Sequence, residues 1–405
     1  MRLFAPTNDQ PHYIALLDIG SASVTGSVAY SAPDGALEIL WSTQERILLK
    51  QITNQAETGR RIMSAFMNVV LELGQSGGQA VRDHYPRGSI DTTQVSIAAP
   101  WSYTITKNVQ YEKEQSFKVS EHLVEQLLST MKEKIQRELQ EHEVADHLGL
   151  RVVSRSVTNM QANGYNIDAA HDQTATAVRM SLSNTVIQNY LHEMIVDAHN
   201  KVLPKSSLQI VSFVLMLYYV MRYTHSEMQE YCIINQTLEA TELGVVRNGI
   251  LCYSTHEPYG MVTLSRDLAT ALAIPIEEMY GIIQSNQWEY RYRELATDTQ
   301  AEVDSILEKY QETIANLLRQ TGDSFTIPKS IYMHTLSCTY DFIGPHIELG
   351  AAAASGMAHI IHNLDEELVS IAAGFGDGRA AHSCVELVSA VYFHTHKNNP
   401  SLISS

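Results

Sequence analysis

A short polar segment near the start of the chain carries residue types that suit phosphate binding. It lies between the apolar run 14–17 and a stretch over 24–28 that alternates apolar and small residues, which predicts a strand, a tight turn and a returning strand. Backbone N–H groups in such a turn can bind an anion, and a carboxylate beside it can hold Mg²⁺ through water. A glycine allows close approach of the backbone, and hydroxyl groups can donate hydrogen bonds. The residues with these properties are Asp18, Gly20, Ser21 and Ser23.

This segment differs from the phosphate loop of P-loop proteins. No Gly-Lys-Ser/Thr sequence follows it, and the next predicted element is a strand instead of a helix. An ordinary hairpin turn that binds nothing is the alternative interpretation of the same residues.

The overall composition limits the size and the function classes of the protein. At 405 residues the chain exceeds a single hydrophobic core, so we expect two or more lobes. The 28 Lys and Arg residues against 45 Asp and Glu residues give a net charge of −17, which argues against general nucleic-acid binding and against adhesion to anionic lipid by charge alone. We therefore expect no nucleic-acid partner.

The hydropathy and cysteine patterns predict a cytoplasmic protein. Residues 1–10 lack the apolar segment of a signal peptide. The most apolar run, 210–221, has 12 residues, which is too few to span a bilayer as a helix and predicts a buried core helix. No Cys-x-x-Cys spacing occurs, so buried free thiols in a reducing compartment are expected. The cysteines are Cys232, Cys252, Cys338 and Cys384.

The elements that would position the polar turn form a first lobe. Apolar periodicity predicts a third strand at 36–41, a helix at 58–73 and a strand at 95–98. The glycine-rich stretch 74–78 is expected to end the helix.

A separate small unit and a second lobe are predicted after this lobe. The small unit begins with an alternating stretch at 101–115 and an amphipathic helix with Ser120 as its N-cap, and Asn163-Gly164 marks a turn. Its other elements are strands at 151–159 and 174–182 and a helix at 183–198. The second lobe starts with an apolar helix at 207–223 and continues with strands at 231–235, 242–247, 250–254 and 330–334 and a helical region at 276–320. A small-residue helix at 350–362 and a closing segment at 370–374 follow it.

The motif D-I-G-S-A-S-V-T-G-S-V at 18–28 resembles the first phosphate motif of the actin-like superfamily. Within that superfamily it is most similar to FtsA, the bacterial cell-division actin, and to PilM, its type IV pilus relative. The unit around Asn163-Gly164 resembles, in order and position, the small SHS2 domain that FtsA inserts into its first lobe. The resemblance covers nearly the whole chain. It implies an α/β, two-lobed actin-like fold with duplicated ribonuclease-H-like lobes and an inserted small α+β domain.

The resemblance also implies a division of the chain into parts. The expected parts are a first lobe at 12–100, an inserted SHS2-type domain at 101–183, a return to the first lobe at 184–206, a second lobe at 207–345 with a helical subdomain at about 270–325, closing helices of the first lobe at 346–395 and a disordered tail at 396–405.

The other two nucleotide motifs of the family are degraded in this sequence. The second phosphate motif aligns with residues 235–242, where Asn235 replaces an acidic residue and every glycine is missing. Thr237 and Leu238 carry Cβ atoms where backbone should meet phosphate, and Glu239 adds negative charge. The adenosine motif aligns with 335–338, where no glycine stands.

ATP and Mg²⁺ are therefore expected to bind weakly or not at all, and we expect no catalytic residue and no hydrolysis. If nucleotide binds, the resemblance assigns the contacts to the first motif and to Asn235 and Thr241, with Asp18 as the contact to Mg²⁺. The complete set of candidate residues is Asp18, Gly20, Ser21, Ser23, Asn235 and Thr241.

Two histidine pairs have a spacing that could ligate zinc. His359 and His362 lie one helical turn apart in the predicted helix, and His394 and His396 alternate near the C-terminus. No cysteine or acidic partner stands at ligand spacing, so core or surface histidines are the favoured interpretation.

The leading functional hypothesis is a cytoplasmic cell-division scaffold of the FtsA type that acts through protein partners, with self-assembly into homo-oligomers as a further prediction. The C-terminal segment lacks a basic amphipathic helix, so we expect recruitment to the inner face of the membrane through a partner and no direct anchor. A PilM-like platform for type IV pilus assembly is the second hypothesis, and an active actin-like ATPase is the third.

Overall fold

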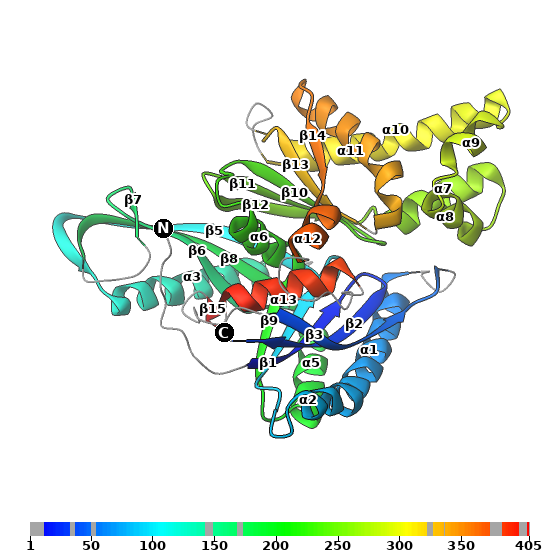
Figure 1. The fold of residues 1–405 in the computed structure, drawn as a ribbon. Helices are drawn as coiled ribbons and strands as arrows, with labels where there is room; N and C mark the ends of the chain where they lie inside the picture. The colour runs from blue at the N-terminus through cyan, green and yellow to red at the C-terminus, as the bar shows by residue number, and fades with distance from the viewer. Residues whose placement is uncertain are drawn as a thin grey trace.

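The computed structural model describes residues 12–32, 37–49, 54–141, 149–167, 173–321, 327–335, 337–372, 383–396 and 403–404. Within them the chain forms three β-sheets with helices packed between and around them (Figure 1). Two of the sheets are the centres of the two lobes, and the third belongs to the inserted domain.

The first sheet has the strand order β3-β2-β1-β4-β9. Its first three strands are antiparallel neighbours, whereas β4 and β9 continue the sheet in parallel. Helices cover both faces, which explains why β1 is a continuous apolar run instead of an alternating one. The strands are β1 (His12–Ile19), β2 (Ser23–Ser31), β3 (Leu37–Arg46), β4 (Thr92–Ile97) and β9 (Ser207–Ser212), and the helices on the two faces are α1 (Gln55–Glu72) with α5 (Asn189–Val202) and α13 (Cys384–His396).

The second sheet repeats the first, with the order β12-β11-β10-β13-β14 and the same pattern of antiparallel and parallel pairs. This repetition confirms the predicted two-lobed architecture. The strands are β10 (Tyr231–Gln236), β11 (Thr241–Arg247), β12 (Ile250–Glu257), β13 (Ser330–His334) and β14 (Ile360–Asn363). The helices of this lobe are α7 (Met261–Leu272), α8 (Ile276–Gln284), α9 (Trp288–Arg293), α10 (Thr297–Arg319), α11 (Tyr340–Ser355) and α12 (Leu364–Ala372).

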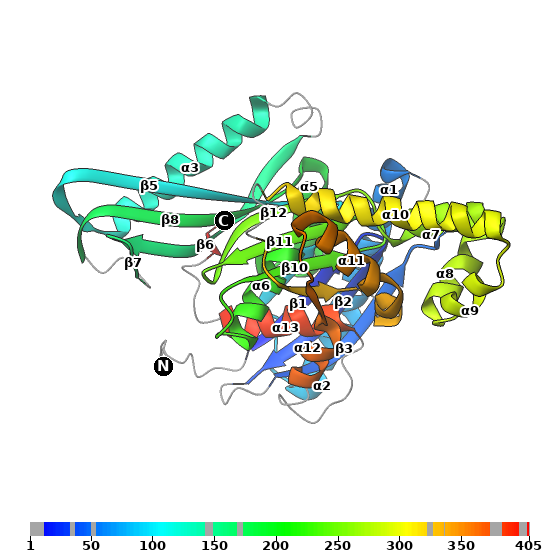
Figure 2. The same cartoon turned by 90° about the horizontal axis from the view of Figure 1, so that it is seen from above.

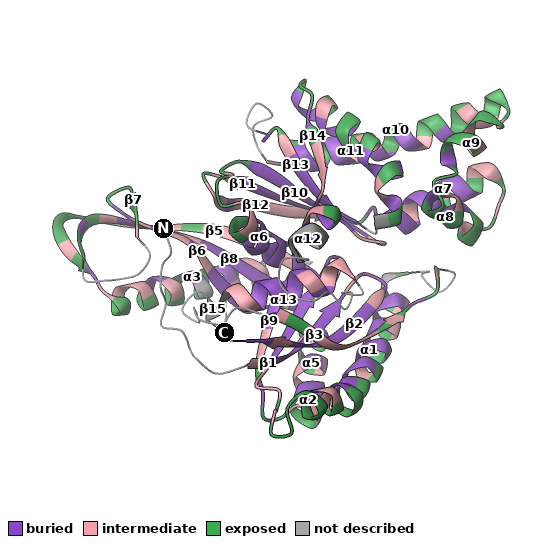
Figure 3. Ribbon diagram, viewed as in Figure 1, coloured by how far each residue is buried: buried purple, intermediate pink, exposed green. Residues whose placement is uncertain are grey.

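Helix α6 (Phe213–Thr224) lies between the two lobes and is apolar around its whole circumference. Its first nine residues are at most 3% exposed, and the helix packs against residues of both sheets together with α12 and α13 (Figure 3). The predicted buried helix is thus confirmed, but it begins later than expected. Residues 207–212 form β9 of the first sheet instead, because an apolar run alone does not separate a buried strand from a buried helix.

The inserted domain consists of a sheet in the order β15-β6-β8-β5 with α3 on one face. It extends to one side of the molecule, at the opposite end from α8 and α9 (Figure 2). Ser120 caps α3 as predicted, since its Oγ accepts a hydrogen bond from Leu123 N at 3.3 Å. Asn163 and Gly164 both have positive φ, of 51° and 83°, as the predicted turn requires. The elements are β5 (Ser102–Val119), α3 (Glu121–Glu141), β6 (Leu150–Ala162), β7 (Tyr165–Asn166), β8 (Gln173–Gln188) and β15 (Ile403–Ser404).

Two boundaries of the inserted domain differ from the expectation. Strand β8 continues to Gln188, so the helix that follows begins at Asn189 and not at residue 183. In the predicted disordered tail, Ile403–Ser404 pairs with β6 as β15, and residues 397–402 and 405 lie outside the described residues.

The glycines at 74–78 do not end the first long helix. A π-helical turn, Leu73–Gly77, connects α1 to α2 (Gly78–His84). A Cβ atom on Gly77 would lie 2.8 Å from Val28 Cγ2, so this glycine permits close packing on the first sheet. The prediction failed because Gly74 and Gly77 allow close packing, on Val202 and Val28, while the chain stays helical.

The closing region was also predicted incorrectly. Helix α11 ends at Ser355, where Gly356 adopts a left-handed φ of 72°, and residues 360–363 form β14 of the second sheet. The proposed helix at 350–362 and the return to the first lobe at residue 346 are therefore wrong. Among the described residues after 346, α13 is the element that covers the first sheet.

Candidate functional site

Four buried ionisable residues gather where the central strands of both lobes end. Asp18 is on β1, Glu242 on β11 and His334 at the end of β13, and Asp365 is in the first turn of α12. All four are at most 8% exposed. We call them the inter-lobe cluster. His334 interacts electrostatically with the three carboxylates, and Asp18 also interacts with Glu242.

Hydrogen bonds within each lobe position these side chains. Ser96 Oγ donates to Asp18 Oδ1 across the parallel pair of β4 and β1. Asn235 Nδ2 donates to Glu242 Oε2 at 2.5 Å, and His334 Nδ1 is paired with Asp365 Oδ1. Each carboxylate therefore keeps a polar partner in a region that excludes water.

Burial changes the acid–base properties of the cluster. It raises the pKa of Asp18 to about 6 and that of Glu242 to about 7, although Ser96 and Asn235 act in the opposite direction. Burial alone would lower the pKa of His334, but the carboxylates of Asp365, Asp18 and Glu242 outweigh this effect and raise it. The arrangement can hold and share protons near neutral pH.

The hairpin turns of the two lobes touch each other next to this cluster. Ser21 Oγ accepts a hydrogen bond from Leu238 N at 2.9 Å, and Trp101 Nε1 donates to Gly20 O at 3.0 Å. The Leu238 side chain packs against the hydrophobic core of the first lobe, as does Val262 from the second lobe. The contact between the lobes is thus both polar and apolar.

The N-terminus of α7 is occupied by the second hairpin turn. Met261 N donates to Thr237 O at 3.1 Å, and Val262 N donates to Leu238 O at 2.8 Å. A Cβ atom on Gly260 would lie 2.5 Å from backbone atoms of the turn, so the glycine allows this close contact. At the N-terminus of a helix, free backbone N–H groups often bind an anion. At the start of α7 these groups instead donate to carbonyl groups of the same chain.

A triphosphate with Mg²⁺ does not fit this arrangement. The hydrogen bond between Ser21 and Leu238 must open before a phosphate group can reach the space between the two turns. The Leu238 side chain would leave the apolar core in the same step. Glu239 adjoins the space, and burial raises its pKa to about 7 despite Arg266 and Thr58.

The structure brings most of the predicted site residues together, but their polar groups form hydrogen bonds with other groups of the same chain. Asp18, Gly20, Ser21 and Ser23 share the first turn, where Gly20 N donates to Ser23 O at 2.9 Å. Asn235 reaches the same region through its bond to Glu242. Thr241 is fully buried, and its hydroxyl group lies within hydrogen-bond distance of Gln236 Oε1 at 2.6 Å and of Tyr259 O at 2.7 Å, so that it is used inside the second lobe.

Sequence reasoning missed Glu242, His334 and Asp365 as members of the cluster, and Cys384 beside them. One ligand atom from each of His334, Asp365 and Cys384 lies within 4.8 Å of the others. These three residues are far apart in the chain and follow no motif spacing, so no local signal could have found them. Burial, with a contribution from Asp365, raises the pKa of the Cys384 thiol well above its usual value.

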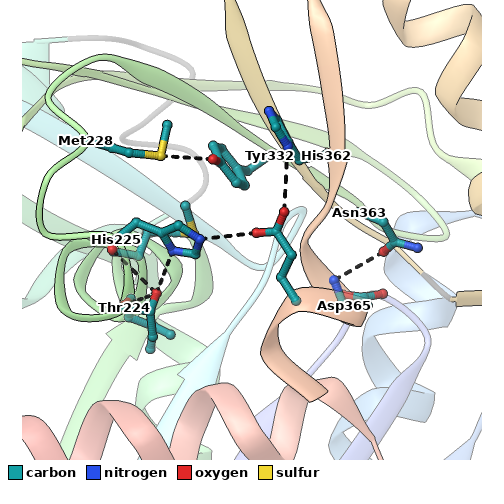
Figure 4. A network of polar contacts seen from close by, with 10 residues as sticks. Thr224, His225, Met228, Tyr332, His362, Asn363 and Asp365 are labelled. Atoms are coloured by element: carbon teal, nitrogen blue, oxygen red, sulfur yellow. Dashed lines mark hydrogen bonds and ion pairs between the residues drawn. The ribbon is translucent and has the colours of Figure 1, made fainter. Parts of the chain in front are cut away.

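A surface network orients α12 and thereby Asp365 (Figure 4). Asn363 Oδ1 accepts a hydrogen bond from Asp365 N at 3.2 Å at the start of the helix. One turn later, Glu367 lies between two histidines, 3.3 Å from His225 Nε2 and 3.6 Å from His362 Nδ1. The network links α6, β14 and α12.

The histidines at 359 and 362 have structural roles in place of the alternative of a zinc site. His362 is on β14 and stacks on the Tyr332 ring with centroids 4.5 Å apart. His359 pairs with Ser355 Oγ at 2.7 Å and with Pro328 O at 3.1 Å. The expected helix around the pair is absent, since β14 occupies 360–363.

Comparison with known proteins agrees with the duplicated lobes. No protein-family model matches the chain, and no curated protein sequence matches it. Among solved structures, the chain is similar to one described as a PilM-PilN type IV pilus biogenesis complex, with a TM-score of 0.59 over 98% of this chain and 100% of that chain at 11% identity. The chain has an actin-like fold.

Other solved structures are similar to this chain at a lower level. The ethanolamine utilization protein EutJ from Carboxydothermus hydrogenoformans has a TM-score of 0.40 at 11% identity, over 95% of this chain and 91% of that chain. The putative N-acetylmannosamine kinase Lmo2764 from Listeria monocytogenes has a TM-score of 0.44 at 11% identity, over 96% and 100%. In the described part of the actin-like chain, no helix has the length and apolar character that crossing a membrane requires.

Proposed function

We propose that this actin-like chain is a scaffold of the PilM type, which acts by binding a protein partner and not by turning over nucleotide. The similarity to the PilM-PilN complex structure carries the proposal, because it extends over nearly the whole of both chains. The direct contact between the two hairpin turns supports weak or lost binding of ATP and Mg²⁺. The net charge of −17 is consistent with a protein partner and not a nucleic-acid partner.

A cell-division scaffold of the FtsA type would have the same general fold, and it stays a proposal beside the first. The pilus hypothesis is preferred because the similar structure with a TM-score of 0.59 is a pilus complex. Self-assembly and recruitment to the inner face of the membrane through the partner are part of both proposals.

The partner prediction separates the two scaffolds. We expect PilN from the same organism to bind the chain with a dissociation constant in the micromolar range or below, measured by isothermal titration calorimetry. A fluorescent fusion of the protein should then co-localise with the pilus machinery in cells. Absence of PilN binding together with a fusion that collects at the division plane would replace the pilus proposal with the division proposal.

The nucleotide prediction concerns the contact between Ser21 and Leu238. Calorimetric titration with Mg-ATP is expected to give no saturable heat up to about 1 mM, equivalent to a binding free energy weaker than about −4 kcal/mol. The Asp18→Ala variant serves as the control and should behave like the parent protein. A micromolar dissociation constant that Asp18→Ala abolishes would contradict the proposal and favour an active ATPase.

A further inference from the structure

Three potential metal ligands of different chemistry meet at one edge of the inter-lobe cluster. His334 ends β13, Asp365 lies in the first turn of α12, and Cys384 is the first residue of α13. One ligand atom from each lies within 4.8 Å of the other two. Three separate elements therefore converge on one point.

One oxygen atom of this group is buried without an N–H or O–H donor. Asp365 is 2% exposed, and its Oδ1 is paired with His334 Nδ1. No N–H or O–H group donates to its buried Oδ2, and its other side-chain partner is the Cys384 thiol, which is a weak donor. An unsatisfied buried carboxylate oxygen is costly, and a cation held between Oδ2 and its neighbours would satisfy it.

The types of donor atom select the kind of cation. Imidazole nitrogen, thiolate sulfur and carboxylate oxygen together match Zn²⁺ and related transition metals. Mg²⁺ and Ca²⁺ prefer oxygen ligands, so they are poor candidates. The carboxylates of Asp18 and Glu242, which interact electrostatically with His334, add negative potential that favours a divalent cation.

We propose that His334, Asp365 and Cys384 form a binding site for a divalent transition metal of the zinc type. Water would complete the coordination. Metal binding would replace the thiol proton of Cys384, which would pass to solvent. The site would connect β13 and α12 of the second lobe to α13, the helix that packs against the first sheet, and would hold the two lobes in one relative position. This proposal is independent of the partner proposed above.

Cobalt substitution tests the site, because a thiolate ligand gives Co²⁺ a near-ultraviolet charge-transfer band. The full chain is stripped with a chelator and titrated with Co²⁺ and then with Zn²⁺ as competitor. We expect the parent protein to show the band and Cys384→Ser to lose it, with Zn²⁺ affinity at least 100-fold weaker. The matched control is Cys338→Ser, at an exposed cysteine outside the cluster, which should keep the band. Mg²⁺ should not displace Co²⁺.

A second measurement uses the parent protein alone, so that it does not depend on the folding of a variant. Zn²⁺ is expected to slow alkylation of Cys384 by a thiol reagent at least tenfold, measured by mass spectrometry of the digested protein, and to leave Cys338 unaffected. Absence of a charge-transfer band, a band that survives Cys384→Ser, or equal alkylation of Cys384 with and without Zn²⁺ would each overturn the proposal.

Discussion

Replacing Leu217 by alanine is expected to lower the free energy of unfolding by about 2–5 kcal/mol. Leu217 lies in α6, is fully buried and belongs to the hydrophobic core that contacts both central sheets. Truncation would leave a cavity that neither sheet can close without moving against the other, because protein interiors are close-packed. Chemical denaturation followed by circular dichroism measures the change.

A surface leucine provides the matched control for this prediction. Leu71 lies on α1 and is 50% exposed. The Leu71→Ala variant should change the free energy of unfolding by about 0.5 kcal/mol or less, because little apolar area returns to water. Equal effects of the two substitutions would show that α6 is not the shared core of the lobes.

Substitution of Glu242 by glutamine is expected to stabilise the protein at pH 8 by about 1–3 kcal/mol and to leave it nearly unchanged at pH 5. Burial raises the pKa of this carboxyl group from 4.5 to about 7 in the folded protein. The folded state therefore binds more protons than the unfolded state between these values, and its stability falls as the pH rises through this window. Glutamine carries no charge, and its side-chain oxygen can still accept the hydrogen bond from Asn235.

The charged neighbours of Glu242 and a chelator are taken into account when the pH dependence of stability is measured. The charged groups that face it are Asp18 on β1 and His334 on β13. Thermal unfolding from pH 5 to pH 8, with a chelator present, should show a smaller decrease for Glu242→Gln than for the parent protein. Glu227→Gln, at an exposed position, is the control and should keep the full decrease. If both variants follow the parent curve, the pKa of Glu242 is not raised by burial in the folded protein, and the prediction is wrong.

Local sequence signals predicted many elements of this fold correctly. The capping hydroxyl of Ser120 and the turn residues Asn163-Gly164 act through neighbouring backbone, and each lies where it was expected. The strand at 330–334 was also predicted with its observed bounds. These features depend on a few adjacent residues, so the sequence contains all the information that they require.

Predictions failed where packing between distant segments overrides local preference. The glycines at 74–78 were expected to end a helix, yet Gly77 lies in a π-helical turn, where its missing side chain makes room for Val28. The apolar run 210–221 crosses the boundary between β9 and α6, and the position of residues 207–212 beside β4 makes the first part a strand.

The amino-acid sequence by itself indicated the two-lobed actin-like architecture, because the motif at 18–28 resembles the first phosphate motif of the actin-like superfamily and the strand and turn signals that follow are in the order which that resemblance implies. The tertiary structure decided which residues form the contacts and the polar cluster between the two lobes. The bond between Ser21 and Leu238 and the convergence of His334, Asp365 and Cys384 join residues that are remote in sequence. Such contacts follow from how whole sheets and helices pack together, because long-range burial, and not the conformational preference of neighbouring residues, brings these groups within reach of one another.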